Sequence, residues 1–448
     1  MINKHKSHHR RAQHTQHQSK PHKGPPVNQF GLLSVVAELI SHLDVTDAPA
    51  DFLVSCFLKE RPNLGARDRS VIAEAVFCWL RLKPRIQYLA QIGATASALR
   101  QAKLALFISG ATQEIWSKGS VEDNEWLSRS INIPLESLPL EAVTCMPLWF
   151  YNQLAKVYGH EMVLGYSAFN LQSAPLDLRV NTLKTTAKNL VSELTEQGVT
   201  CEPISGLSAG VRVSGKPNLM QTALFKDGLF EFQDAGSQWV SKLVAPRRGD
   251  LVIDFCAGAG GKTLAIGALM KNTGRIVAVD NHEKRLLKFK PRAARAGLSN
   301  FSTLCVNDEN DERLNKFYAK ADRVLVDAPC SGSGTLRRNP DLKYKYTDKE
   351  LAEFIQTQQH ILKSAARLVR PDGRLVYVTC SLFAEENEFQ IEWFLSQHPE
   401  FRLRRWTEVL PPSDRPQGAY ESRDCLLLWP HLSNTDGFFA AVLQRVKG

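Results

Sequence analysis

A repeated alternation of short apolar strands and helical segments fills the chain after residue 249. The five expected strands are rich in Val, Ile and Leu, and they are LVIDF (251–255), RIVAVD (275–280), FSTLCV (301–306), RVLVDAP (323–329) and RLVYVTC (374–380). Strands of this kind separated by helices are typical of a mostly parallel sheet covered on both faces. CLLLWP (425–430) and FFAAVLQRV (438–446) lie too close together for a crossover helix, so we expect an antiparallel edge pair. The predicted fold class is α/β with a doubly wound sheet.

Three further segments precede this sheet. Apolar residues spaced three and four positions apart predict packed helices from about residue 29 to residue 165. Residues 166–240 combine short strand patterns with one amphipathic helix and indicate a small α+β domain, and Asp234 has the position of a helix N-cap. We therefore expect a tail at 1–28, a helical domain at 29–165, the α+β domain at 166–240 and the doubly wound domain at 241–448.

The positive charge of the chain is concentrated at its N-terminus. The chain has 56 Lys and Arg against 46 Asp and Glu, and six of the basic residues lie before Gly24 with six histidines and no acid. Such a tail suits a solvated segment or an electrostatic tether to a polyanion, and its histidines could also capture a metal. The basic balance permits a nucleic-acid partner without proving one.

Several protein classes are excluded by simple patterns. No apolar run approaches the ~18 residues of a membrane span, and the basic start lacks a secretory signal pattern, so we expect a cytoplasmic protein. The nine cysteines show no CxxC or Cys/His zinc spacing, so we expect neither a disulfide framework nor a bound metal. Each cysteine is then a packed thiol or a reactive one.

A glycine-rich loop follows the first expected strand of the sheet. DFCAGAGGKT (254–263) is not a phosphate-binding loop, because Cys256 stands where that motif needs its first glycine, and it does not fit GxGxxG. Its glycines let the backbone turn sharply and approach a ligand closely. Asp280 closes the second strand, where an acid can bind ribose hydroxyls. Together these features favour a nucleoside site over a plain helix cap at Asp280.

Two cysteines follow the fourth and fifth expected strands. Cys330 lies in DAPCSGSGT (327–335) and Cys380 lies in TCS (379–381). Because the carboxyl ends of parallel strands form one rim, both thiols are expected beside the nucleoside site. A cysteine is usually a small buried apolar residue, but two of them at one ligand rim favour covalent chemistry.

Five segments resemble the Sun/Nop family of RNA cytosine-5 methyltransferases, in their bacterial type. They are QDAGS (233–237), DFCAGAGGKT (254–263), VDAPCSGSGTLRRNP (326–340), TCSLFAEENE (379–388) and DGFF (436–439). The resemblance is clear from about residue 175 onward and fainter over 30–165. It implies a Rossmann-like class I methyltransferase domain at 241–448, S-adenosylmethionine as the cofactor and a helical domain of RNA-binding type. Gly258 and Ala259 depart from the family pattern, which usually has alanine and proline there.

The resemblance also implies roles for single residues. Cys380 would be the nucleophile that adds to carbon 6 of cytosine, and Cys330 would assist product release. Protonating the base at N3 stabilises the adduct, and Asp327 suits that role, whereas Lys262 would either orient catalytic groups or merely offset nearby acids. The residues expected around the cofactor are Cys256, Ala257, Gly258, Ala259, Gly260, Gly261, Lys262, Asp280, Asp308 and Asp327. The residues alone leave the order of the two cysteines open, because DNA cytosine-5 enzymes use the cysteine of their Pro-Cys segment, which would be Cys330.

A basic and aromatic run follows Cys330. Its members are Arg337, Arg338, Lys343, Tyr344, Lys345 and Tyr346. Basic residues beside aromatic ones suit phosphate contact and base stacking, so the four basic residues are expected to bind RNA. By analogy with bacterial members we expect ribosomal RNA as the partner, and a monomer. The alternatives are a tRNA or DNA cytosine-5 methyltransferase, or a non-catalytic RNA-binding ribosome-assembly factor.

Overall fold

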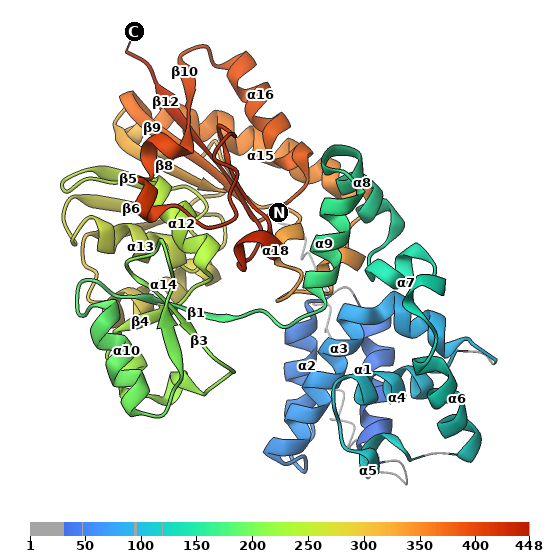
Figure 1. The fold of residues 1–448 in the computed structure, drawn as a ribbon. Helices are drawn as coiled ribbons and strands as arrows, with labels where there is room; N and C mark the ends of the chain where they lie inside the picture. The colour runs from blue at the N-terminus through green and yellow to red at the C-terminus, as the bar shows by residue number, and fades with distance from the viewer. Residues whose placement is uncertain (1–30, 47, 94–95, 119, 448) are drawn as a thin grey trace, which may run out of the picture.

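The computed structural model describes residues 31–447, apart from residues 47, 94–95 and 119. Three parts follow one another along the chain (Figure 1): a group of helices, a small antiparallel sheet, and a large sheet covered by helices. The basic tail expected at residues 1–28 lies outside the described residues.

Within the described residues, seven α-helices form the first part. They are α1 (Leu32–Asp44), α2 (Ala50–Lys59), α3 (Ala66–Ala90), α4 (Ala98–Ile108), α5 (Gln113–Trp116), α6 (Val121–Ile131) and α7 (Leu140–Thr144). The longest, α3, buries Ile72, Val76 and Trp79 along the stripe that the sequence predicts. The helical prediction is confirmed here. Among the helices that the structure describes, none combines the length and the apolar character of a membrane span.

Two further helices, α8 (Leu148–Tyr158) and α9 (His160–Asn170), pack on the core of the large sheet. The ring centroids of Phe150 and Phe383 lie 4.9 Å apart, and those of Tyr166 and Trp429 lie 5.6 Å apart. Residue 165, where the domain boundary is expected, lies inside α9. Helical periodicity predicts which face of a helix is buried, but not which domain buries it.

The small antiparallel sheet has the strand order β2-β3-β1-β4. Its elements are β1 (Leu176–Val180), α10 (Ala187–Glu196), β2 (Cys201–Pro203), β3 (Gly210–Val213), α11 (Ala223–Lys226) and β4 (Phe230–Phe232). Next comes α12 (Ala235–Leu243), and its predicted N-cap Asp234 accepts hydrogen bonds from two backbone N–H groups of the first turn. Helix α12 packs on the large sheet. Residue 240, where the next domain boundary is expected, lies inside this helix.

The large sheet has the order β10-β12-β9-β8-β5-β6-β7, with β11 paired to β12. Its parallel strands are β5 (Leu251–Asp254), β6 (Arg275–Asp280), β7 (Phe301–Cys305), β8 (Ala321–Asp327) and β9 (Val369–Thr379). The helices α13 (Gly261–Leu269), α14 (Glu283–Ala296), α15 (Asp348–Leu368) and α16 (Glu388–Gln397) pack against it. All five predicted parallel strands are present, and the doubly wound α/β fold is confirmed.

Three antiparallel strands complete the sheet. They are β10 (Phe401–Arg404), β11 (Leu426–Leu428) and β12 (Phe438–Arg445), with the short helices α17 (Trp406–Val409) and α18 (Pro430–Ser433) between them. The predicted pairing of β11 with β12 is confirmed, with Leu427 opposite Phe439. The predicted edge position is wrong for β12, because β12 pairs with both β9 and β10. Its apolar residues 438–443 are all buried, which is typical of an interior strand.

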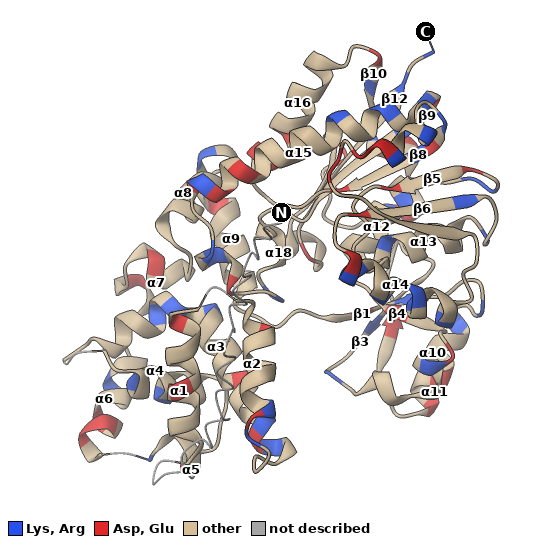
Figure 2. Cartoon of the chain, turned by 180° about the vertical axis from the view of Figure 1, so that it is seen from behind, with Lys and Arg blue, Asp and Glu red and all other residues tan. Residues whose placement is uncertain are grey.

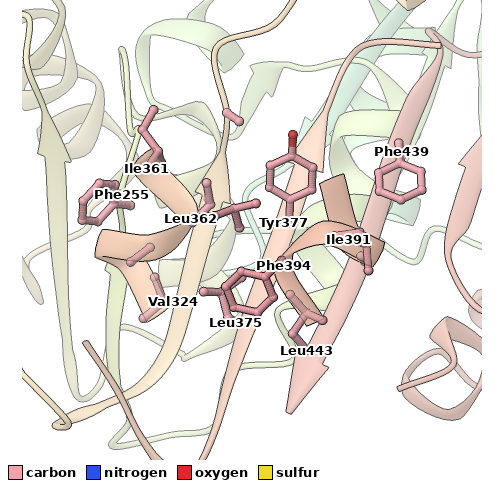
Figure 3. Close-up of a cluster of buried hydrophobic side chains, with 14 of the residues drawn as sticks. Phe255, Val324, Ile361, Leu362, Leu375, Tyr377, Ile391, Phe394, Phe439 and Leu443 are labelled. Carbon is pink, nitrogen blue, oxygen red and sulfur yellow. The ribbon is translucent and has the colours of Figure 1, made fainter. Parts of the chain in front are cut away.

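One face of the sheet carries the core that Figure 3 shows. Val324, Leu375 and Tyr377 point from the strands toward Leu362 of α15 and Phe394 of α16. All five side chains are completely buried. Close packing of this kind fixes the strand ends, and the residues that follow them are thereby held in place.

Candidate active site

A cavity of about 920 Å³ lies at the carboxyl ends of the central strands. The strand β5 lies between β6 and β8, so successive connections run to opposite sides of it. Ligands of doubly wound sheets bind at such a switch point. The wall is built from the segments that follow β5, β6, β7 and β8, with contributions from β1, α14 and α15.

The glycine-rich loop after β5 forms one wall of this cavity. Gly258 and Gly260 have positive φ angles of 55° and 78°, a region that favours glycine. A Cβ at Gly260 would overlap the Phe289 ring, whereas a Cβ at Gly258 would meet no atom of the described residues within 4 Å. The loop backbone therefore borders free space that a ligand can fill. The predicted cofactor residues that line the cavity are Cys256, Ala257, Gly258, Ala259, Gly261, Lys262, Asp280, Asp308 and Asp327, whereas Gly260 serves the turn.

Two predicted nucleoside-binding acids line the cavity but are held differently. Asp280 ends β6 and is buried, and its carboxylate accepts hydrogen bonds from the backbone N–H groups of Gly258 (2.8 Å) and His282 (2.8 Å). Asp308 is exposed in the loop after β7, where it accepts a hydrogen bond from the backbone of Asn310 (2.8 Å). Asp280 is therefore fixed in a position from which its remaining lone pairs can accept hydrogen bonds from a ribose.

A lysine and an aspartate form an ion pair in the cavity wall. Nζ of Lys262 on α13 lies 2.8 Å from the carboxylate of Asp327, which ends β8. Burial lowers the pKa of Lys262, but the charge and hydrogen bond of Asp327 outweigh burial, so the pKa is raised overall. Burial also raises the pKa of the neighbouring Asp254 to about 7, although Thr263 donates a hydrogen bond to it at 2.6 Å. The lysine therefore stays charged inside the protein.

The structure brings the two cysteines of the strand rim together. The sulfur atoms of Cys330 and Cys380 lie 3.4 Å apart, and both residues are partly buried. Pro329, the residue before Cys330, is part of the cavity wall. The hydrogen bond to Cys380, together with burial, raises the pKa of Cys330 well above its usual range. The thiol of Cys330 is therefore kept protonated beside Cys380.

A buried carboxylate holds the two cysteine loops together. Glu386 is completely buried and accepts hydrogen bonds from the backbone N–H of Ser331 (2.9 Å) and from Nε2 of Gln358 (2.9 Å). It also accepts hydrogen bonds from the hydroxyls of Ser331 and Ser381. Each serine directly follows one of the two cysteines. Burial raises the pKa of Glu386, and these donors oppose the rise.

The helix α9 reaches the same loops. The buried hydroxyl of Tyr166 donates a hydrogen bond to the carbonyl oxygen of Ser333, 167 positions further along the chain. Neither Tyr166 nor Glu386 was singled out by the sequence analysis. Glu386 belongs to the TCSLFAEENE segment, but nothing in that segment alone indicates a partner in the other loop. Tyr166 lies in a helical stripe, which usually marks plain core packing.

Two of the four residues expected to bind RNA, Arg337 and Lys343, are buried against other parts of the chain. Arg337 is buried over the Phe169 ring, 4.3 Å from its centroid, and donates a hydrogen bond to the carbonyl oxygen of Thr435 (2.8 Å). Lys343 is buried too, and its Nζ donates to the carbonyl oxygen of Arg81 on α3 (2.8 Å). Each side chain therefore links the segment after Cys330 to a distant part of the chain through a hydrogen bond to a backbone carbonyl.

The other two basic residues of this run are ion-paired within the chain. Arg338 lies 2.7 Å from Asp436 and 3.0 Å from Asp234, and it still lines the large cavity. Lys345 lies 2.6 Å from Asp341. Their charges are therefore offset by acids rather than displayed to solvent.

Exposed basic residues gather instead on α14, where Figure 2 shows Lys and Arg in blue. Those exposed along this helix are Lys284, Arg285, Lys288 and Lys290. None of the four takes part in an ion pair with another described residue, and Arg285 lines the large cavity. The strongest unpaired positive charge beside the cavity is therefore on α14.

Two family models match the chain. The model of the 16S rRNA methyltransferase RsmB/F matches residues 241–444, and that of the ferredoxin-like domain of RsmF/B-like methyltransferases matches residues 146–219. The probable ribosomal RNA small subunit methyltransferase B of Synechocystis is 36% identical over 69% of this chain and 69% of that protein. Its counterpart in Bacillus subtilis is 31% identical over 76% and 74%. The chain belongs to this family. It is an RNA methyltransferase that depends on S-adenosylmethionine, and the resemblance noted from the motifs is confirmed.

Solved structures share the fold. The crystal structure of PH0851 matches 92% of this chain and 98% of its own, with a TM-score of 0.74 and 26% identity. A methyltransferase homologue from Pyrococcus horikoshii matches 68% of this chain and 97% of its own, with a TM-score of 0.59 and 28% identity. NSun6 from Pyrococcus horikoshii, solved with SFG, has a TM-score of 0.60 at 21% identity, a likeness of fold alone.

Proposed function

We propose that this methyltransferase adds a methyl group to carbon 5 of a cytosine in the small-subunit ribosomal RNA. The observation that carries the proposal is the pair of thiols 3.4 Å apart, close to the ion pair of Lys262 and Asp327. Carbon 5 of cytosine is a weak nucleophile, so the reaction needs a group that adds to carbon 6 and later departs, and a thiolate can do both. The names of the relatives support ribosomal RNA as the substrate.

In the first step Cys380 adds to carbon 6 as a thiolate, and the C5–C6 double bond supplies its electron pair to carbon 5. When bound, S-adenosylmethionine supplies an electrophilic methyl group on a sulfonium. Gly258 and Asp280 of the cavity wall would hold this cofactor, and carbon 5 would take the methyl group as the methyl–sulfonium bond breaks. Carbon 5 then loses its proton to a base, the double bond re-forms, and the bond from carbon 6 to Cys380 breaks.

The neighbouring groups match the needs of these steps. Lys262 places a positive charge near Cys380, and a thiolate is the form of cysteine that attacks. Asp327, fixed by Lys262, is suited to hold a proton at N3 of the base, which stabilises the adduct. Cys330 has a raised pKa and lies in hydrogen-bond contact with Cys380, so its S–H can donate to the departing thiolate. This is how Cys330 assists release.

The RNA must present the cytosine out of its stack, because both thiols are partly buried and Pro329, beside Cys330, belongs to the cavity wall. The exposed basic residues of α14 lie beside that cavity and are suited to contact RNA phosphates. Phosphate contact is therefore proposed for α14 in place of the run after Cys330.

The test uses tritiated S-adenosylmethionine and total RNA from a strain that lacks this protein. We expect wild type to label ribosomal RNA, Cys380→Ala to label none, and Cys330→Ala to accumulate a covalent protein–RNA adduct on denaturing gels. Cys201→Ala, on β2 of the small sheet, is the matched control and should behave as wild type. The labelled nucleotide is then identified as 5-methylcytidine by mass spectrometry.

Other outcomes overturn separate parts of the proposal. An adduct with Cys380→Ala instead would make Cys330 the nucleophile. Label confined to tRNA or DNA would overturn the substrate, and a different methylated nucleoside would overturn the chemistry. If wild type binds S-adenosylmethionine but labels no nucleic acid, the chain is a non-catalytic factor.

A further inference from the structure

A second cavity, of about 440 Å³, lies between the helical domain and the segment that follows Cys330. Its walls include Asp51 at the start of α2, Phe77 on α3, and Leu342 and Tyr346 on the other side. From a Cβ built on Gly332, Leu342 lies at 2.8 Å and the sulfur of Cys380 at 4.0 Å. The second cavity is therefore a neighbour of the thiol pair.

Arg338 connects the second cavity to the first, since it lines both. Two acids hold its guanidinium, at 2.7 Å and 3.0 Å, so this shared wall is fixed. An RNA strand that places one base at the thiols has its next nucleotide within reach of the second cavity. The two cavities are suited to consecutive nucleotides of one strand.

The two sides of the second cavity are also tied to each other. The backbone N–H of Ala50 on α2 donates to the carboxylate of Asp341 (3.2 Å), and Nζ of Lys345 donates to the carbonyl oxygen of Ala48 (3.1 Å). Lys345 and Asp341 also form an ion pair at 2.6 Å. The cavity is thus already shaped before a ligand arrives, which favours specific binding.

The composition of the walls indicates what binds there. Two basic side chains, Arg338 and Lys345, are matched by two acids, Asp51 and Asp341, so the cavity does not favour an anion such as a phosphate. Aromatic side chains offer faces on which a base can stack. The carboxylate of Asp51 is exposed and takes part in no hydrogen bond or ion pair with another described residue. An acceptor of this kind is satisfied by the N–H donors of a base edge.

We propose that the second cavity binds the unstacked base of the nucleotide next to the target cytosine, and that Asp51 selects a base with an exocyclic amino group. Adenine, cytosine and guanine each present such a donor, whereas uracil presents one N–H between two carbonyl oxygens that a carboxylate repels. This inference rests on the proposed function, because it takes the target base to lie at the thiols. It gives the helical domain a direct part in choosing the site of methylation.

The test measures, by anisotropy, equilibrium binding of four fluorescein-labelled 12-nucleotide RNA strands that share one central cytosine and are otherwise all A, all C, all G or all U, named rA, rC, rG and rU. Wild type is expected to bind rU about 10-fold more weakly than the other three strands, as is usual for one lost base contact. Asp51→Asn should reduce that difference to less than about threefold, since an amide both donates and accepts. Tyr346→Leu should weaken all the strands alike. Glu125→Gln, an exposed acid of α6 outside both cavities, is the matched control.

The outcomes separate this inference from the proposed function. If wild type and Asp51→Asn show the same preference among the four strands, the inference is wrong, whether or not RNA is methylated. If wild type methylates no RNA but Asp51→Asn still loses the discrimination against rU, the base site stands and the proposed chemistry fails. Unfolding in urea shows that each variant is folded.

Discussion

Replacing Glu386 by alanine should release both cysteine loops at once. The side chain accepts four hydrogen bonds at a completely buried position. The backbone N–H of Ser331 has no other acceptor among the described residues, and Nε2 of Gln358 keeps one of its two hydrogens on the carbonyl oxygen of Pro329 (3.0 Å) but loses the acceptor of the other. The hydroxyls of Ser331 and Ser381 already lie 3.1 Å apart and can bond to each other. Each buried donor left without an acceptor costs about 1–3 kcal/mol.

The expected loss of stability for Glu386→Ala is about 3 kcal/mol, because removing a buried carboxylate offsets part of the cost of two unsatisfied donors. Glu386→Gln should lose only about 1 kcal/mol, since its carbonyl oxygen keeps the two N–H donors and the serine hydroxyls can rotate to accept from its amide. Glu392→Ala, an exposed change on α16, should stay within about 0.5 kcal/mol of wild type.

Urea denaturation gives these free energies of unfolding, and initial rates of tritium transfer to RNA give the catalytic effect. We expect kcat of Glu386→Ala to fall about 10- to 100-fold, because the thiols lose their common support. KM for S-adenosylmethionine should change less than about twofold, because Glu386 lies outside the wall of the large cavity. A loss under about 1 kcal/mol with unchanged kcat would refute the reasoning that Glu386 fixes the thiol pair.

Three further predictions concern the cofactor loop, the buried acid and α14. Gly260→Ala should raise the Kd for S-adenosylmethionine at least about 10-fold in calorimetry, because its Cβ overlaps the Phe289 ring at positive φ; normal affinity would contradict this. Burial raises the pKa of Asp254 to about 7, so the native state holds a proton that the unfolded chain releases near pH 4. The stability of wild type relative to Asp254→Asn should therefore fall by about 2–3 kcal/mol from pH 5 to pH 8 in urea titrations, and a flat difference would show that the carboxyl is ionised throughout. Lys288→Glu combined with Lys290→Glu should weaken RNA binding and flatten its salt dependence in anisotropy titrations, whereas an unchanged slope would exclude phosphate contact by α14.

The sequence was sufficient wherever a local pattern determines structure. Alternating apolar segments predict the five parallel strands, and the rule that ligands bind at strand carboxyl ends predicts one rim for Asp280, Cys330 and Cys380. The glycines at 258 and 260 predicted a turn, and both have positive φ. These features depend on neighbours in sequence or on one general rule of sheet topology.

The features that the sequence did not predict depend on partners far along the chain. Composition indicates the charge of Arg337 and Lys343, but not that their donors meet carbonyl groups 98 and 262 positions away. The sequence pattern predicts an edge position for β12, because it does not show that β12 also pairs with β10. The partners of Glu386 and Tyr166 were missed for the same reason, since no periodicity links two separate loops.

The buried side chain of Lys343 ties the segment after Cys330 to the helical domain. Burial lowers its pKa to about 8, so keeping it charged at pH 7 costs roughly 3 kcal/mol relative to an exposed lysine. The carbonyl oxygen of Arg81 on α3 offsets part of this cost only in one geometry, because the hydrogen bond is directional. A segment that begins at Cys330 is thus held at one defined position against the helical domain, and Tyr166 of α9 holds it again at Ser333. A displacement of α3 or α9 would therefore move the loop of Cys330 as well, so these helices and the two thiols form one mechanical unit.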